Sequence, residues 1–157
     1  MLHRKYPPNA NKWNGVGGKI KDGETPLQTC LREVYEETGF SMSALEFGGV
    51  LTWEGFEIEN GGLYIFHGTA LDGEPLTGTD EGFLQWQPRQ WVFTSADVVS
   101  NIHLFAPPML SGSPPQEYFF KYLNGKIVSH EIRPLPGWVN IHSPESISPQ
   151  RFVDRLK

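Results

Sequence analysis

The sequence predicts an α/β protein, because one strongly capped helix is followed by several segments with the pattern of β-strands. The helix pattern covers residues 25–39. Strand patterns occupy residues 45–56, 62–71 and 117–132, where aromatic and β-branched residues alternate or cluster between turn residues. Helix and strands together indicate a sheet packed against helices.

The helix has a defined start and a defined end. Thr25 is a good N-cap, Pro26 is suited to the first helical position because it needs no N–H there, and Gln28 completes a capping box. Gly39 is suited to the left-handed conformation that ends many helices. We therefore expect the helix to run between these residues.

Two faces of this helix differ in character. Leu27, Leu31 and Val34 recur at helical spacing and are expected to face a core. Glu33, Glu36 and Glu37 gather on another face. Clustered carboxylates repel one another, and with Glu24 nearby they resist full ionisation unless a cation is present. Mg²⁺ and Mn²⁺ prefer oxygen ligands and commonly combine carboxylates with substrate phosphates, so this face predicts a divalent-metal site.

The rest of the chain predicts further elements. Asn124-Gly125 joins two strand-like runs, 117–123 and 126–132, and this dipeptide favours a type I′ hairpin turn. Residues 95–104 predict a second helix that begins at Ser95. The prolines that follow predict a loop that could border a pocket: Pro107, Pro108, Pro114 and Pro115.

Composition favours one domain. The chain has 157 residues, 38% of them hydrophobic, which is enough for a single core. We expect one domain over residues 1–157, with a tail over 134–157 that ends in a short helix over 149–157.

Composition also excludes several classes of partner. The net charge of −5 and the lack of a basic stripe argue against a duplex nucleic-acid surface. No apolar run is long enough to span a bilayer. Cys30 is the single cysteine, so an internal disulfide is excluded and a reducing cytoplasmic compartment is the default.

A longer motif contains this acidic helix and identifies a family. The pattern is a glycine, a glutamate six residues later, and then Arg-Glu-x-x-Glu-Glu-x-Gly after a fixed gap. It is matched by Gly18, Glu24, Arg32, Glu33, Val34, Glu36, Glu37, Gly39 and Phe40. In these residues the chain resembles the Nudix hydrolase family.

The resemblance implies a fold, a metal and a reaction. The implied fold is an α/β/α sandwich around a mixed central sheet, and the implied reaction is attack of water on the phosphorus of a nucleoside diphosphate derivative. Glu33, Glu36, Glu37 and the carbonyl of Gly18 would hold Mg²⁺, for which Mn²⁺ could substitute. Glu33 also resembles a general base, and Arg32 resembles the residue that holds the helix carboxylates in place.

One further acidic residue resembles a metal ligand. Glu81, in Thr79-Asp80-Glu81-Gly82, matches the distal carboxylate that many triphosphate-directed members bring to the metal from a loop. The same cluster is also typical of an exposed turn, and Asp80 is a competitor for the role.

The residues before the motif point to a nucleotide substrate. Residues 12–19 closely resemble the MutT-like subgroup, which acts on oxidised purine triphosphates such as 8-oxo-dGTP. That resemblance implies that Asn14 and Asn101 read the base and that Arg4 and Lys19 hold phosphates. Asn14 is equally suited to be a turn residue before Gly15.

Several alternatives remain open at this stage. Trp53, Trp86, Trp91 and Phe105 could stack on a base, although most such aromatics form core. The ADP-ribose subgroup usually has a proline about fifteen residues after the motif, and no proline lies between Phe40 and Pro75, so that substrate class loses ground. A nucleotide-binding module without catalysis is the rival from another class, but such a module would be expected to have lost the carboxylates.

The start of the chain departs from the family pattern. Family members ordinarily have about twenty residues, including a first strand, before the stretch that matches residues 2–4. We therefore expect the domain to lack this strand, with an exposed sheet edge that a neighbouring segment or a second subunit in a homodimer could complete.

Overall fold

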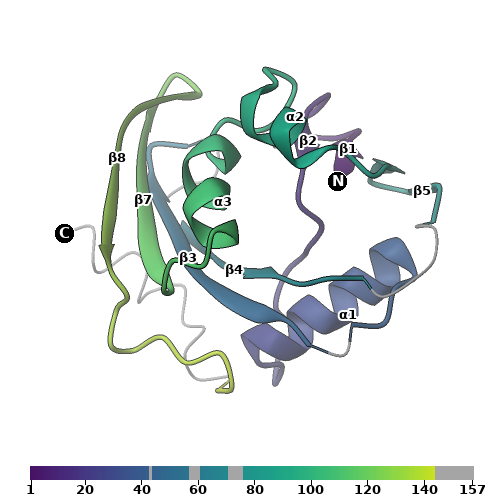
Figure 1. Cartoon of the computed structure of the whole chain (residues 1–157), viewed down its shortest axis with the longest axis horizontal. Coiled ribbons are helices and arrows are strands. Elements are labelled where there is room, and N and C mark those ends of the chain that lie inside the picture. The colour runs from purple at the N-terminus through teal and green to yellow at the C-terminus, as the bar shows by residue number, and fades with distance from the viewer. Residues whose placement is uncertain (43, 57–60, 71–75, 144–157) are drawn as a thin grey trace.

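Two four-stranded sheets and three helices form the described part of the protein (Figure 1). The structure is a computed structural model that describes residues 1–42, 44–56, 61–70 and 76–143. The helices are α1 (Pro26–Thr38), α2 (Arg89–Thr94) and α3 (Ile102–Leu110). The strands are β1 (Leu2–Arg4), β2 (Trp13–Asn14), β3 (Glu46–Glu54), β4 (Gly61–His67), β5 (Gly78–Thr79), β6 (Gly82–Leu84), β7 (Gln116–Leu123) and β8 (Lys126–Pro134).

The larger sheet is mixed and has the order β4-β3-β7-β8. β3 pairs parallel with β7, with Leu51 opposite Tyr118, whereas the β3–β4 and β7–β8 pairs are antiparallel. A parallel pair needs a long crossover, and here the chain makes it between β4 and β7 through the smaller sheet, α2 and α3. The predicted mixed sheet is confirmed.

The smaller sheet is antiparallel, with the order β2-β1-β6-β5. β1 lies in its interior, where Leu2 faces both Asn14 and Leu84. Sequence reasoning described residues 2–14 only by their motif and missed this sheet, because strands of two or three residues carry almost no periodic signal.

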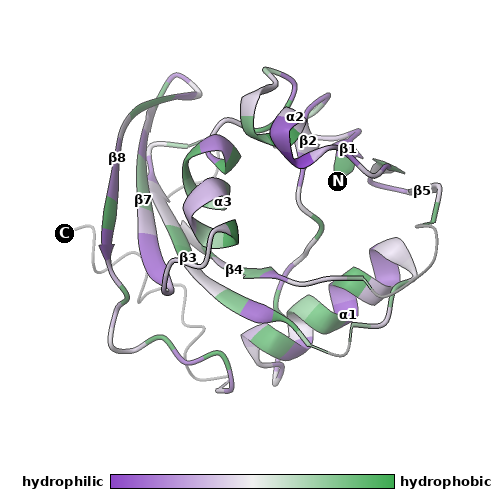
Figure 2. Cartoon of the chain, viewed as in Figure 1, coloured by the Kyte–Doolittle hydropathy of each residue, from purple (hydrophilic) through white to green (hydrophobic). Residues whose placement is uncertain are grey.

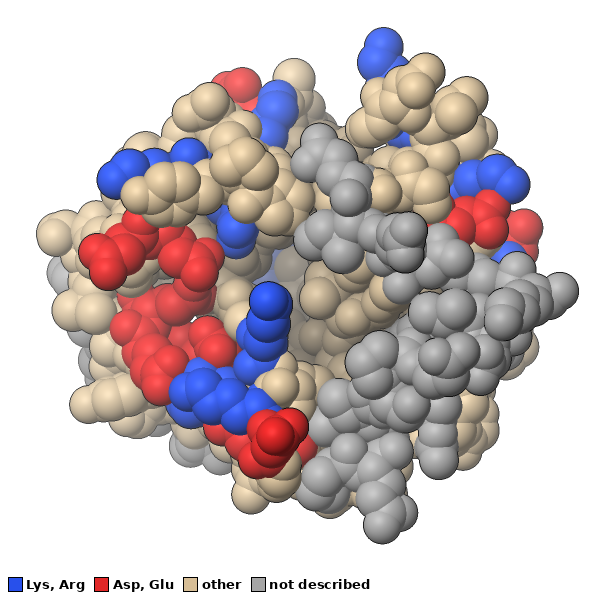
Figure 3. Space-filling model, turned by 180° about the vertical axis from the view of Figure 1, so that it is seen from behind, with Lys and Arg blue, Asp and Glu red and all other residues tan. Residues whose placement is uncertain are grey.

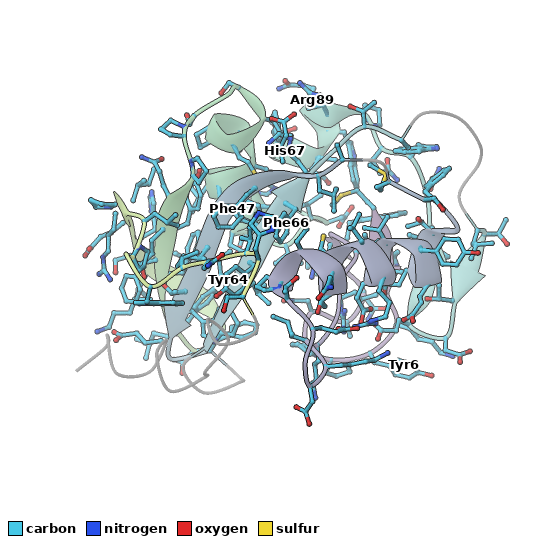
Figure 4. The ribbon with its side chains drawn as sticks, turned by 90° about the horizontal axis from the view of Figure 1, so that it is seen from below. Tyr6, Phe47, Tyr64, Phe66, His67 and Arg89 are labelled. Atoms are coloured by element: carbon cyan, nitrogen blue, oxygen red, sulfur yellow. The ribbon has the colours of Figure 1, made fainter. Side chains whose placement is uncertain are left out.

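Helices lie on opposite faces of the mixed sheet, as the predicted α/β/α class requires. On one face, Leu104 and Phe105 of α3 pack against Leu51, Tyr118 and Phe120. On the other face, three aromatic rings of the β3–β4 hairpin cluster beside α1 (Figure 4): Phe47, Tyr64 and Phe66, with Phe47 5.4 Å from Phe66.

The predicted ends of α1 are confirmed. The side chain of Thr25 accepts from the N–H of Gln28 at 3.1 Å, and the side chain of Gln28 accepts from the N–H of Thr25 at 2.9 Å. Gly39 is left-handed with φ of 79° and donates to the carbonyl of Tyr35. Figure 2 shows the apolar and polar stripes along the helix; Leu27, Leu31 and Val34 on the apolar stripe are half-buried.

The two predicted hairpins are present. Asn124 and Gly125 both have positive φ, 52° and 72°, as a type I′ turn between β7 and β8 requires. β3 and β4 fall within the strands predicted over 45–56 and 62–71, except that β4 begins one residue earlier. The first part of the turn predicted between them, and the final residue of the second run, lie outside the described residues.

The helix predicted over 95–104 is wrong in its start, because α3 begins only at Ile102. Ser95 ends α2 instead of starting a helix, because its N–H donates to the carbonyl of Trp91 and its hydroxyl accepts from Asp97. Val98 then pairs with Trp13 in a bridge, with turns at residues 96–97 and 100–101 on either side of it. The competing interaction is therefore a long-range backbone pairing that no local pattern contains.

The break predicted at Pro107 and Pro108 is also wrong, because both prolines lie inside α3. Burial of Ala106 and Met109 on the same helix favours the helical path. The carbonyls of both prolines accept from the N–H of Ser111, so the helix end remains satisfied. Pro114 and Pro115 do lie in a connecting loop, as predicted.

The chain after β8 carries no helix or strand as far as it is described, and the helix predicted over 149–157 lies outside the described residues. The carbonyl of Ile141 accepts from the N–H of Leu27, which places this segment beside the start of α1. None of the helices in the described part of the chain has the length and apolar character needed to cross a membrane.

The capping box at Thr25 generates a prediction about stability. Thr25→Ala removes the oxygen that accepts from Gln28, so the free energy of unfolding should fall by about 1 kcal/mol. Thr25→Ser keeps that oxygen and should stay within about 0.5 kcal/mol of wild type. Urea denaturation of the three proteins measures both changes, and equal losses in Ala and Ser would contradict the role of the cap.

Candidate active site

The loop before α1 and the helix itself bring two carboxylates against the backbone. The N–H of Gly17 donates to Oε2 of Glu37 at 2.8 Å. A Cβ added to Gly18 would lie 2.4 Å from Oε1 of Glu33, which shows that the Glu33 carboxylate rests directly on the glycine. Only a residue without a side chain permits this approach.

Arg32 holds three of the carboxylates. Its Nε and Nη2 donate to the two oxygens of Glu24 at 2.7 and 2.9 Å, which is a bidentate pair. Its Nη1 donates to Glu33 at 2.5 Å and to Glu36 at 3.0 Å. The predicted positioning geometry of Arg32 is therefore present.

These bonds shift the acidity of both partners. Hydrogen bonds from Arg32, and then from Thr29, lower the pKa of Glu24 to about 2. Hydrogen bonds to Glu24 and Glu33 raise the pKa of Arg32 further above its already high value. Glu24 and Arg32 thus stay charged throughout the physiological range, and Glu24 is committed to orienting the arginine.

Glu37 is the carboxylate in the most unusual environment. Its residue is buried, and loss of water raises its pKa to about 7. Neighbouring Glu81 and Glu33 contribute to this rise in pKa, whereas the Gly17 N–H and Arg4 oppose it. Its proton is therefore held at slightly acid pH, and a nearby cation would release it.

Glu81 lies close enough to Glu37 to affect its pKa, although 44 residues separate them in the chain. It sits in the turn between β5 and β6, where its carbonyl accepts from the N–H of Lys5 at 2.7 Å. Its carboxylate pairs with Arg4 at 3.3 Å. The structure thus brings Glu81 toward the helix carboxylates and places Arg4 beside it.

The donor set fits a hard divalent cation in its chemistry. Glu33, Glu37 and the Gly18 backbone adjoin one another, and all are oxygen donors. As the side chains lie, however, no three acidic, His or Cys residues in the described ranges converge around one point. Glu33 and Glu36 accept from Arg32 instead, so they would have to turn toward a bound ion.

Figure 3 shows the same site as a surface. Acidic side chains form a band on the side of the molecule that carries α1, with basic side chains beside them, and the band borders a hollow. A polyanionic substrate would be repelled by such a band unless a cation neutralised it.

The residues predicted to bind substrate occupy varied positions. Asn14 is the last residue of β2 and not a turn residue; its Oδ1 accepts from the N–H of Gly15 at 2.9 Å, which leaves its amide hydrogens available. Nδ2 of Asn101 donates to the hydroxyl of Tyr122 at 3.3 Å at the start of α3. The carbonyl of Lys19 accepts from Arg32 at 3.3 Å. Backbone bonds between Trp13 and Val99 bring the segments that carry both asparagines together.

The aromatic candidates divide between core and surface. Trp91 packs against the buried cluster of Trp13, Val98 and Ile102. Trp53 and Phe105 pack against the β7 core. Trp86 lies 5.8 Å from the ring of Phe40 and, at 57% exposure, is the one of these four that is exposed.

Sequence reasoning missed three residues of the site. Gly17 supplies the N–H that binds Glu37, Thr29 donates to Glu24 at 2.7 Å, and Tyr122 holds Asn101. Thr29 stands three residues before Arg32 and eight residues before Glu37, and that helical spacing could have indicated it. Nothing local marks Tyr122, which comes from a strand 21 residues further along.

Family comparison agrees with this fold. A mixed sheet between helices, with a glycine loop and an Arg-Glu-x-x-Glu-Glu helix, defines a Nudix-type fold. The family model for the NUDIX domain matches residues 1–111. The chain belongs to the NUDIX family.

Similar proteins are named for nucleotide substrates. The chain is 40% identical over 78 residues to an oxidized purine nucleoside triphosphate hydrolase of Danio rerio and 36% identical over 78 residues to that of Mus musculus. Each match covers 49% of this chain and 49% of the relative. The chain thus spans about half the length of these curated relatives.

Solved structures extend the likeness over more of the chain. The MutT protein of Bacillus halodurans superposes with a TM-score of 0.73 and 26% identity, covering 86% of this chain and 89% of that one.

A shorter sequence match, 40% identical over 50 residues, links this chain to the NAD-capped RNA hydrolase NudC of Haemophilus influenzae, covering 32% of this chain and 19% of that one.

The contact between Gly18 and Glu33 generates a prediction about metal binding. Gly18→Ala places a Cβ where the Glu33 carboxylate lies and should weaken Mn²⁺ binding by about tenfold or more. Gly15→Ala is the matched control, because a Cβ there meets nothing within 4 Å. Titration calorimetry measures both affinities; equal affinities in the two variants would show that Glu33 does not need this position.

Proposed function

We propose that this protein hydrolyses a nucleoside triphosphate to the monophosphate and pyrophosphate, with Mg²⁺ as its cofactor and an oxidised purine such as 8-oxo-dGTP as its substrate. The observation that carries the proposal is the acidic cluster around Glu33, Glu36 and Glu37, ordered by Arg32 and joined by Glu81. A cluster of this kind suits phosphate chemistry because a divalent cation joins carboxylate to phosphate oxygens.

The residues of the cluster would share metal binding, positioning and proton transfer in this proposal. Glu33, Glu36, Glu37, Glu81 and the Gly18 carbonyl would hold Mg²⁺, which when bound neutralises phosphate charge and supplies an activated water. Arg32 holds Glu33 and Glu36 on the helix face until they turn toward the ion, while Glu24 fixes Arg32. Glu33 would take the proton of the attacking water, as its resemblance to the general base of the family implies.

Other residues would bind the nucleotide. Arg4 already pairs with Glu81 beside the cluster, so its guanidinium is placed to contact phosphate, and Lys19 adjoins Gly18 in the same loop. Asn14 has free amide hydrogens and Asn101 a free carbonyl oxygen, so together they offer a donor and an acceptor to a base. The oxidised purine triphosphate hydrolases among the relatives favour this substrate class.

The alternative substrate is a nucleoside diphosphate linked to another group, including ADP-ribose. The short likeness to an NAD-capped RNA hydrolase favours it, because NAD contains such a linkage. The same cluster would serve either substrate, since both are cut at a phosphoric anhydride. A non-catalytic nucleotide-binding module remains the rival from another class.

Two further features belong to the proposal. We place the protein in the cytoplasm because its single cysteine, Cys30, excludes an internal disulfide, which suits a reducing compartment. We treat residues 1–157 as one Nudix domain, with residues 134–157 as its tail.

A substrate screen tests the proposal. Pyrophosphate or phosphate release is followed with 8-oxo-dGTP, the ordinary triphosphates, ADP-ribose and NAD, with and without Mg²⁺. We expect the oxidised purine triphosphate to give the highest kcat/KM, turnover to stop when Mg²⁺ is chelated, and Glu36→Gln to lower turnover on the order of 100-fold.

Glu46→Gln is the matched control, because its side chain is 81% exposed on β3 and outside the acidic cluster. Preferred cleavage of ADP-ribose or NAD would overturn the substrate while keeping the chemistry. Tight nucleotide binding without turnover would show a binding module instead. In that case the nucleotide affinity measured without metal should be the same in Glu36→Gln as in wild type.

A further inference from the structure

The outer edge of the mixed sheet, formed by β8, is exposed to solvent. β8 is the last strand in the order β4-β3-β7-β8, and seven of its nine residues are exposed. Ile132 in particular is 50% exposed, although it lies opposite buried Tyr118. An exposed edge strand presents unpaired backbone groups to another strand, and here Ile132 adds an exposed apolar side chain near the C-terminal end of β8.

Two oppositely charged residues of β8, Glu131 and Arg133, lie close together on the strand. Glu131 and Arg133 lie on either side of Ile132. Their side chains point to the same face of the sheet, because the two residues are two positions apart on a strand. Nε of Arg133 donates to Glu131 at 2.8 Å, and the Glu131 side chain stays 59% exposed. Its carboxylate can therefore accept from a second guanidinium.

We propose that this protein forms a symmetric dimer by antiparallel pairing of β8 with β8 of a second copy, centred on Ile132. In this register Ile132 lies opposite its own copy, and Glu131 of each protomer lies opposite Arg133 of the other. Two cross-strand ion pairs and one aliphatic pair then join the sheets into one of eight strands. The interface is self-complementary, as a two-fold axis requires.

Neighbouring registers are less favourable. With a two-fold axis perpendicular to the sheet, one residue of β8 must lie opposite its own copy. The alternative registers are therefore those centred on the residues next to Ile132. Centring on Glu131 places Glu131 opposite Glu131, and centring on Arg133 places Arg133 opposite Arg133, so both oppose like charges. Centring on His130 would extend the ladder across Val128, where the β7–β8 register already shifts. The centre at Ile132 avoids each of these faults.

The interface leaves the acidic cluster free. In Figure 1, β8 lies at the opposite side of the molecule from α1, with β7, β3 and β4 between them. Dimerisation through β8 is therefore independent of the proposed hydrolysis, and variants at Glu131 and Arg133 should keep wild-type turnover. A failure of the proposed activity leaves the dimer prediction intact.

A charge-swap experiment tests the dimer and its register. Glu131→Arg and Arg133→Glu each place like charges opposite in a homodimer, so each alone should dimerise at least about tenfold more weakly than wild type. Mixed in equal amounts, the two variants restore opposite charges at both pairs and should form a heterodimer. Sedimentation velocity over a range of concentrations measures all four samples.

Circular dichroism and thermal unfolding check that each variant is folded, and the recovery of a heterodimer itself excludes misfolding. Ile132→Cys adds a register test, because a short bismaleimide should link two copies through residue 132, whereas His130→Cys should link poorly. Wild type that stays monomeric at high concentration would overturn the proposal, and so would a mixture that fails to associate or faster linking through residue 130.

Discussion

The ion pairs of Arg32 are the interaction on which the site depends. One guanidinium binds Glu24 through two bonds and reaches Glu33 and Glu36 with a third nitrogen. Without it, several carboxylates on one helix face would repel one another and turn toward solvent. The capping box at Thr25 and the left-handed Gly39 fix the two ends of that helix, so local backbone signals set the position of the charges.

The sheets provide what the helix alone cannot. The smaller sheet ties residues 2–4 to residues 82–84, and this pairing carries Glu81 and Arg4 to the side of Glu37. Burial and neighbouring carboxylates then shift the pKa of Glu37 in the same direction. The protein therefore combines one carboxylate that releases its proton readily, Glu24, with one that retains it near neutrality. That contrast follows from hydrogen bonding in the first case and from loss of water in the second.

Features with a local cause could be predicted from the sequence, whereas features with a distant cause could not. The caps of α1 and the turn at Asn124-Gly125 were predictable because each depends on a few adjacent residues. The acidic face followed from helical spacing. The helix expected from Ser95 failed because Val98 pairs with Trp13, and the break expected at Pro107 failed because Ala106 and Met109 are buried. The contacts Gly17–Glu37 and Asn101–Tyr122 likewise join distant segments, so no local pattern contained them.

The most direct test of the metal site is the proton balance of Mg²⁺ binding. Titration calorimetry in buffers of different ionisation enthalpy gives the number of protons released at pH 6 and at pH 9. Because burial holds the pKa of Glu37 at about 7, binding at pH 6 should release close to one proton, and binding at pH 9 almost none. Glu37→Gln should release almost none at either pH, whereas Glu46→Gln should behave as wild type. Binding without proton release at pH 6, or the same release in Glu37→Gln, would show that this carboxylate does not face the ion.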